Sequence, residues 1–286
     1  MQLGRLGVWY GMDRLDGKQL GPFVGMVERL GYDALWYPEG RGYESLSLAG
    51  FLLAHSTRLK VGSSIASIYA RDAFTARRGL ITLRDLHGDR FILGLGVSHI
   101  PMVEGMRGHV YEKPVPAMRA YLDGIMKDQQ GAEQWPIALA ALGPRMLALA
   151  AAKTRGALPY NVTPEHTALA KAILGPSKWL AVEQKVCLET DPVRARDLGR
   201  RELERYLALP NYRDNWLRLG FTEAELANGG NDRFIDAMVL WGDAATVKRN
   251  LKKHFDAGAT HVCIQPVHAA DDFVARDRTL EALADT

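Results

Sequence analysis

The residues of this chain that can do chemistry lie in short polar stretches directly after apolar runs. Glu39 follows the apolar run 34–38, and His99 follows the run 91–95. A carboxylate and an imidazole at such positions can exchange protons with a ligand, and histidine has the intrinsic pKa of a general acid or base. We therefore predict that both residues are catalytic. The alternatives are that Glu39 is a loop carboxylate paired with Arg41, and that His99 is a plain loop residue, one of eight histidines.

Two further stretches offer backbone and small side chains to a ligand. Ser63, Ser64 and Ile65 end the third apolar run, where small residues let a planar molecule approach the chain. Gly96 and Ser98 follow the fourth run and can turn N–H groups toward an anion. We predict cofactor contacts at all five, although small residues also serve packing and tight turns.

The fifth and sixth runs are each followed by a predicted helix start. Gly143 precedes Pro144 and Arg145, and a proline at the first helical position leaves N–H groups that can bind phosphate. Arg145 either adds a charged contact or faces solvent. Tyr160 ends the sixth run, and Thr163 shortly after it is a predicted N-cap. We include Gly143, Arg145 and Tyr160 among the predicted cofactor contacts.

Several familiar catalytic patterns are missing from the sequence. It holds no H-x-x-x-H, C-x-x-C or cluster of carboxylates, so we expect no metal, and no G-x-S-x-G supports a hydrolase. Cys187 and Cys263 both lie in apolar runs and are predicted to be buried thiols. A site rich in backbone donors and poor in nucleophiles favours a protein whose cofactor does the chemistry.

Composition limits the partners and the location. Of 286 residues 47% are hydrophobic, and the net charge of +3 is a small excess spread along the chain, so we expect no nucleic-acid partner. The N-terminus has no signal-peptide pattern, and no apolar run reaches about 18 residues. We expect a soluble, cytoplasmic protein that acts on a small-molecule substrate.

The elements that must position these residues alternate along the chain. Predicted strands cover residues 6–10, 34–38, 59–65, 91–95, 136–140, 156–160, 181–188 and 261–265. Predicted helices cover residues 20–30, 46–55, 73–86, 115–126, 145–153, 164–174 and 271–285. This alternation predicts an α/β fold, a single (β/α)₈ TIM barrel over residues 1–286. An open doubly wound sheet is the alternative, but the first strand lacks the G-x-G-x-x-G that dinucleotide-binding sheets carry.

About 70 residues between the seventh and eighth strands form an insertion. It is predicted to hold a helix over residues 192–207, a turn at Pro210–Asn211 and further helices through Phe255. Its stretch 210–216 and Phe221 are rich in aromatic side chains. They suit a substrate lid, a dimer contact or plain helix packing.

Taken in order, these segments resemble the bacterial luciferase-like superfamily, especially its oxidoreductases that depend on the deazaflavin coenzyme F420. The resemblance covers nearly the whole chain. It is carried by the stretches 31–39, 59–65, 88–96, 140–147 and 158–166.

The resemblance implies a barrel enzyme, often dimeric, that moves a hydride between a deazaflavin and a substrate or uses reduced FMN with oxygen. It implies a non-prolyl cis peptide at Ser64–Ile65 behind the flavin-type ring. It also implies that Glu39 faces the ring, that the loop 96–99 contacts the cofactor and that the helix start 143–145 contacts phosphate.

This sequence departs from the family pattern at three places. Glu39-Gly40 replaces an acidic-His pair, Ser98-His99 replaces Gly-Glu, and Arg71-Asp72-Ala73 replaces Arg-x-Pro. The sugar-phosphate dehydrogenase chemistry of some members therefore does not transfer. An FMN-dependent monooxygenase and a non-catalytic barrel that binds a small molecule are the alternatives to an F420-dependent enzyme.

Overall fold

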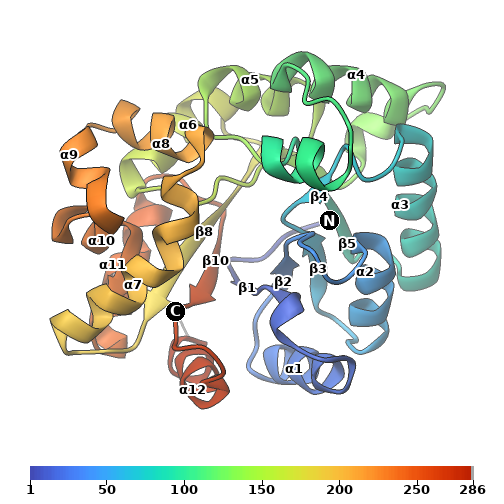
Figure 1. Cartoon of the computed structure of the whole chain (residues 1–286). Helices are drawn as coiled ribbons and strands as arrows, with labels where there is room; N and C mark the ends of the chain where they lie inside the picture. The colour runs from blue at the N-terminus through green and yellow to red at the C-terminus, as the bar shows by residue number, and fades with distance from the viewer. Residues whose placement is uncertain (285–286) are drawn as a thin grey trace.

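Eight parallel strands of this chain close into a barrel with helices around the outside (Figure 1). The computed structural model describes residues 1–284. The pairing of β10 with both β1 and β8 closes the ring. The barrel strands are β1 (Leu6–Trp9), β2 (Ala34–Tyr37), β3 (Lys60–Ser63), β5 (Phe91–Gly96), β6 (Ile137–Leu139), β7 (Gly156–Ala157), β8 (Trp179–Cys187) and β10 (His261–Pro266). The predicted (β/α)₈ barrel is confirmed, and the open-sheet alternative is wrong.

The helices around the barrel begin where the sequence supplies capping groups. Asp16 and Gln19 form a complete capping box at α1, and Thr163 accepts a hydrogen bond from the His166 N–H at α6, as predicted. Gly31 follows α1 with φ +92°, a conformation that glycine adopts without a steric penalty. These helices are α1 (Gly17–Arg29), α2 (Ser45–Ala54), α3 (Ala73–His87), α4 (Pro114–Met126), α5 (Pro144–Lys153), α6 (Pro164–Leu174), α11 (Ala244–Asp256) and α12 (Phe273–Leu283), with short 3₁₀ turns η1 (Met12–Arg14) and η3 (Ala132–Gln134).

The insertion between β8 and β10 forms a helical unit at the left of Figure 1. It comprises α7 (Pro192–Leu207), α8 (Pro210–Arg218), α9 (Glu223–Leu226), η4 (Ala227–Gly229) and α10 (Asp232–Met238). Trp216 is fully buried and packs edge-to-face on Phe234, which Phe221 contacts from another side. Helix packing therefore accounts for Trp216 and Phe221, two of the aromatics for which the sequence left a lid or a dimer contact open.

Several local features differ from the sequence prediction. The predicted turn at Pro210–Asn211 lies instead in the first turn of α8. The third strand ends at Ser63, and a two-residue strand β4 (Ala66–Ser67) then pairs with β5. The predicted loop after β5 contains a π-helix, η2 (Pro101–Met106). A strand, β9 (Val239–Trp241), replaces part of the predicted helical insertion because its apolar residues pair with the end of β8. The predicted closing helix ends at Leu283, and its last predicted residue, Asp285, lies outside the described residues.

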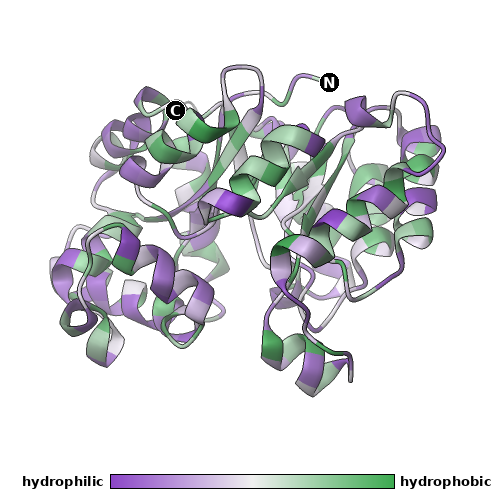
Figure 2. Ribbon diagram, turned by 90° about the horizontal axis from the view of Figure 1, so that it is seen from above, coloured by the Kyte–Doolittle hydropathy of each residue, from purple (hydrophilic) through white to green (hydrophobic). Residues whose placement is uncertain are grey.

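The apolar residues fall into an outer layer and a barrel interior. The outer layer lies between the strands and the helices, and Figure 2 shows apolar strands in the middle with polar helix faces outside. The interior holds large rings, among them Trp9, Trp36 and Trp179. Trp36 donates a hydrogen bond of 3.0 Å to the buried His261. Parallel strands that are covered on both faces have nearly continuous apolar sequences, and for this reason the strands could be predicted from the sequence.

Two further expectations concern cysteines and membranes. Cys187 and Cys263 are free, buried thiols in β8 and β10, as predicted. Within residues 1–284, no helix combines the length and the apolar character that crossing a membrane requires.

Candidate active site

The predicted site residues follow the C-terminal ends of neighbouring barrel strands. Glu39 follows β2, the segment 64–65 follows β3, residues 97–99 follow β5, the segment 143–145 follows β6 and Tyr160 follows β7. Because all eight strands are parallel, these ends gather at one rim of the barrel. This rim is called the barrel mouth below.

The segment after β3 is held in place by backbone bonds to the end of β2. Its Ser64–Ile65 peptide is cis, as the resemblance implied. The Ser64 N–H donates to the Tyr37 carbonyl at 2.6 Å, and the Glu39 N–H donates to the Ile65 carbonyl at 3.2 Å. Both Ser64 and Ile65 are half-buried, so the segment keeps an accessible edge at the mouth.

Glycines in β5 fit closely against this segment. A Cβ on Gly96 would lie 2.4 Å from Ile65 Cγ1, and a Cβ on Gly94 would lie 1.9 Å from the Ser63 carbonyl oxygen. The Ser63 hydroxyl also bonds to Gly94, donating to its carbonyl at 2.9 Å and accepting from its N–H at 3.0 Å. Ser63 is fully buried, so in this structure its side chain joins β3 to β5.

Glu39 forms an ion pair with Arg71, which lies in the connection between β4 and α3. Its side chain is 4% exposed and pairs with both terminal nitrogens of Arg71, whose side chain is 7% exposed. The Ser67 N–H donates to the same carboxylate at 2.8 Å. Arg41, the partner considered from the sequence, instead places its backbone N–H 3.0 Å from Asp13. The carboxylate therefore sits in a buried ion pair directly beneath the mouth.

The guanidinium of Arg71 also reaches Glu44, the N-cap of α2, at 2.9 Å. Burial lowers the pKa of Arg71, but its bonds and charge interactions with Glu39 and Glu44 outweigh burial and raise that pKa overall. Arg71 thus carries a permanent charge between two carboxylates. It fixes the loop after β2 to the loop after β3.

His99 is half-buried at the other side of the mouth, where it meets the insertion. Its ring centroid lies 5.8 Å from that of Tyr212 in α8. Burial lowers the pKa of His99, and a hydrogen bond with Asn211 opposes part of that shift. The imidazole is therefore neutral at neutral pH and able to accept a proton.

The first turn of α5 has backbone N–H groups that no side chain caps, and there is free space beside Gly143. Gly143 is the N-cap, no side chain caps the first turn, and Arg145 is exposed. A Cβ on Gly143 would meet nothing closer than 3.9 Å. A helix end with free N–H groups and room beside it fits an anionic group such as phosphate.

A buried charged pair in β8 escaped the sequence analysis. Lys185 is 1% exposed, and its Nζ lies 2.6 Å from Asn161 Oδ1 and 3.2 Å from Glu183 Oε1. Burial lowers the pKa of Lys185 and raises that of Glu183, while their mutual attraction opposes both shifts. The available signal was the alternation Glu183-Gln184-Lys185, because two charges spaced by two residues in a doubly covered strand must face the barrel interior together.

Above Lys185, tyrosine rings cover the centre of the mouth. The Nζ lies 4.1 Å from the centroid of the Tyr160 ring, within cation–π distance. Tyr160 contacts Trp9 at 5.0 Å, Tyr206 at 5.4 Å and Tyr212 at 6.1 Å between centroids. Predicted residue Tyr160 is thus the centre of an aromatic cluster that joins the barrel to α7 and α8.

The Tyr160 hydroxyl belongs to a hydrogen-bond circuit with a defined direction. Gln265 donates through Nε2 to Glu202 at 2.8 Å, so its Oε1 faces Tyr160 and accepts a hydrogen bond from the tyrosine hydroxyl at 2.8 Å. Tyr206 then donates to Tyr160 at 2.7 Å, and Arg205 donates to Tyr206 at 2.6 Å. Burial raises the pKa of both tyrosines, so their hydroxyls remain protonated.

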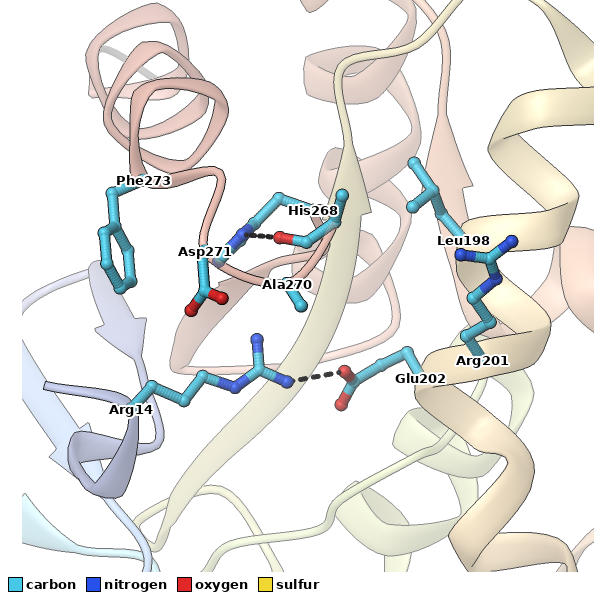
Figure 3. A pocket seen from close by; sticks show the side chains of 9 residues that line it. Arg14, Leu198, Arg201, Glu202, His268, Ala270, Asp271 and Phe273 are labelled. Carbon is cyan, nitrogen blue, oxygen red and sulfur yellow. Dashed lines mark hydrogen bonds and ion pairs between the residues drawn. The ribbon is translucent and has the colours of Figure 1, made fainter.

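A cavity of about 360 Å³ adjoins this circuit on the side of α7 and α12 (Figure 3). Arg14 and Glu202 form an ion pair of 3.1 Å in its wall, and Arg201, His268 and Phe273 also line it. Its lining does not include the predicted residues at the ends of β3, β5 and β6. The cavity therefore lies beside the predicted cofactor contacts, with Glu202 as the wall shared with the tyrosine circuit.

The comparisons with known proteins agree with this architecture. The family model of the luciferase-like monooxygenases matches residues 4–132. A Mycobacterium tuberculosis protein, named provisionally as a coenzyme F420-dependent oxidoreductase, is 32% identical over 124 residues, which are 43% of this chain and 35% of that protein. The matched part thus spans about a third of this relative's length.

Solved structures match over nearly the whole chain. An F420-dependent secondary alcohol dehydrogenase, in complex with an F420–acetone adduct, covers 98% of this chain with 99% of its own, at 12% identity and a TM-score of 0.74. The oxygenating constituent of 3,6-diketocamphane monooxygenase from Pseudomonas putida, in complex with FMN, covers 98% and 96%, at 14% identity and a TM-score of 0.71. The fold and the family match together confirm the resemblance to the luciferase-like superfamily.

Proposed function

We propose that this chain is an oxidoreductase that transfers a hydride between coenzyme F420 and a small organic substrate at the barrel mouth. The observation that carries the proposal is the mouth itself, where the accessible edge of residues 64–65 lies on the same rim as the half-buried His99 and the uncapped start of α5. Its relative and one structural neighbour with F420 in their names support this cofactor.

The residues present suit such a cofactor in two ways. Ser64, Ile65 and Tyr160 offer a half-buried surface for a flat ring, and Gly96 and Ser98 shape the adjoining strand end. The segment 143–145 offers free N–H groups and the exposed Arg145 to a phosphate. Ser63 is left out of the proposed set because its hydroxyl is already bonded within the sheet. When bound, F420 supplies the hydride donor or acceptor.

We propose separate roles for the two predicted catalytic side chains, proton handling for His99 and positioning for Glu39. His99 is neutral and half-buried, so it can accept a proton from a substrate hydroxyl when the substrate is oxidised. Glu39 is paired with Arg71 and accepts from the Ser67 N–H, so we propose that its carboxylate holds the Ser67–Arg71 connection in place below the mouth. Replacing Glu39 with Gln and His99 with Ala tests both assignments, and unchanged turnover in both variants would remove them.

Cofactor titration tests the function directly. We expect the fluorescence of oxidised F420 to be quenched or shifted when the coenzyme binds the protein. No binding at about 100 μM, well above ordinary cofactor dissociation constants, would contradict the proposal. Turnover is then sought with reduced F420 and a panel of carbonyl and enone compounds. Binding without turnover of any compound would favour the non-catalytic barrel.

An FMN-dependent monooxygenase is the second candidate, favoured by the family model's name and by the neighbour solved with FMN. A parallel FMN titration separates the two cofactors. Oxygen consumed in step with substrate would favour FMN, whereas turnover unaffected by removing oxygen supports F420.

The domain organisation, the assembly and the location of the protein are also proposals. We infer a single luciferase-like domain over residues 1–286 that acts as a cytoplasmic homodimer without nucleic-acid partners. Sedimentation equilibrium of the full chain measures the assembly, and a mass of one chain at all concentrations would contradict the dimer.

A further inference from the structure

Two buried N–H donors near the centre of the mouth have no hydrogen-bond partner within the described part of the chain. They are the indole Nε1 of Trp9 and the amide Nδ2 of Asn161. Trp9 is 5% exposed and Asn161 is 3% exposed. A buried donor without an acceptor is unfavourable, so each such group needs an explanation.

Trp9 lies where a bound ring would meet the barrel interior. It is the last residue of β1, and its ring stands 5.0 Å from the Tyr160 ring. The interior cluster that contains Trp9 is covered at the mouth by Ile65 and Tyr160. The indole therefore belongs to the layer directly beneath the proposed ring surface.

The surrounding protein groups do not satisfy the indole because they are committed elsewhere. The Tyr160 hydroxyl donates to Gln265 and accepts from Tyr206. Gln265 turns its own N–H to Glu202. The acceptor for Trp9 must come from outside this set.

The orientation of Asn161 is also fixed by its neighbours. Its Oδ1 accepts from Lys185, which can only donate, so the Nδ2 group must point away from the lysine. The residue has φ 56°, and its backbone bonds to Glu183 and Trp216 hold it there. The unpartnered group at Asn161 is thus a donor, like that of Trp9.

We propose that Trp9 binds the ligand of the mouth by donating its indole N–H to a carbonyl oxygen, with Asn161 Nδ2 as a second donor to the ligand. We expect a neutral acceptor, because Lys185, the buried cation that Asn161 contacts, is already paired with Glu183. The inference rests on the proposed function, since it deepens the description of the same site. The carbonyl belongs either to the coenzyme ring or to the substrate.

Nuclear magnetic resonance of the indole groups tests this on the intact protein. The chain has six tryptophans, so ¹⁵N labelling gives six indole N–H signals, and Trp9→Phe identifies that of residue 9. We expect this signal to move downfield when F420 or a probe ketone such as cyclohexanone is added in excess. Trp135→Phe makes the same chemical change before β6, at the opposite end of the barrel, and serves as the control.

Binding constants distinguish the two sources of the carbonyl. If the acceptor is the coenzyme, Trp9→Phe should weaken F420 binding about fivefold, the loss typical of one neutral hydrogen bond. The Trp135→Phe control should bind F420 as tightly as the wild type. If the acceptor is the substrate, the F420 dissociation constant stays unchanged and the KM for the ketone rises by about the same factor. An unmoved indole signal and unchanged constants in both assays would overturn the proposal.

Failure of the proposed function gives a different result. If the wild-type chain binds neither F420 nor FMN by calorimetry, the assigned cofactor is wrong. The Trp9 signal is then followed against cyclohexanone alone, where a shift supports the inference and its absence overturns it.

Discussion

At the scale of single residues, the barrel mouth is organised by charges that are buried and paired. Lys185 and Glu183 face each other inside β8, and Arg71 and Glu39 do so beneath the rim. A buried pair gains little over apolar packing, but removing one partner leaves a charge in a low-dielectric interior. These residues therefore constrain what can be substituted at the mouth.

Lys185→Met should lower the free energy of unfolding by about 3–5 kcal/mol, because Glu183 then stays buried without a cation. Urea denaturation measures the loss. The double variant Lys185→Met with Glu183→Gln should recover part of it, since no unpaired charge remains. Glu183→Gln alone completes the cycle, and a loss in the double variant equal to the sum of the two single losses would mean that the pair carries no coupling.

The lowered pKa of His99 predicts a pH profile. A base whose pKa is lowered stays neutral at neutral pH and gains its proton only below its ordinary value of 6.5. In the direction of substrate oxidation, kcat/KM should therefore fall with decreasing pH, with a midpoint below 6.5, and His99→Gln should remove this limb and reduce kcat about 100-fold. A limb that persists in the variant would assign the titration to another group.

At the scale of elements, close backbone contacts set where the strands meet. Gly94 in β5 lies against the Ser63 carbonyl of β3, and Gly96 lies against Ile65. On the other side, α7 of the insertion is tied to the mouth because Glu202 accepts bonds from both Gln265 and Arg14. The strand ends and the insertion thus depend on each other for position.

Gly94→Ala should destabilise the protein by about 3 kcal/mol, because the new methyl group would lie 1.9 Å from a backbone oxygen that cannot move alone. Gly17→Ala is the matched control. Nothing lies within 4 Å of a Cβ at that position in the first turn of α1, so its effect should stay within about 0.5 kcal/mol. Thermal unfolding of both variants measures the contrast, and similar melting temperatures would contradict the packing argument.

At the scale of the whole molecule, two neutral histidines join distant parts of the barrel. His254 in α11 accepts at Nδ1 from Thr167 of α6, at 2.8 Å, and faces Gln184 of β8 with Nε2 at 2.8 Å. His261 in β10 accepts from Trp36 of β2 at 3.0 Å. Burial lowers the pKa of each histidine to about 4.

These shifts predict acid destabilisation. The unfolded chain protonates both histidines near pH 6.5 while the folded chain does not, so stability is complete above pH 6.5 and falls as the pH drops toward 4, by about 3 kcal/mol for each histidine. Urea denaturation between pH 7.5 and 4.5 measures the fall, and His254→Gln should remove about half of it. A pH dependence unchanged in that variant would show that carboxylates cause it.

The sequence by itself determined the barrel and the order of the elements, because parallel strands covered on both faces require apolar runs, and caps such as Thr163 mark helix starts locally. It also placed Glu39, His99 and Tyr160 at one rim. Only the tertiary structure decided their partners: Arg71 rather than Arg41 for Glu39, Tyr212 for His99, and Gln265 for Tyr160. These contacts join residues up to 113 positions apart in the chain, as between His99 and Tyr212, and side-chain packing across such separations leaves no local pattern in the sequence.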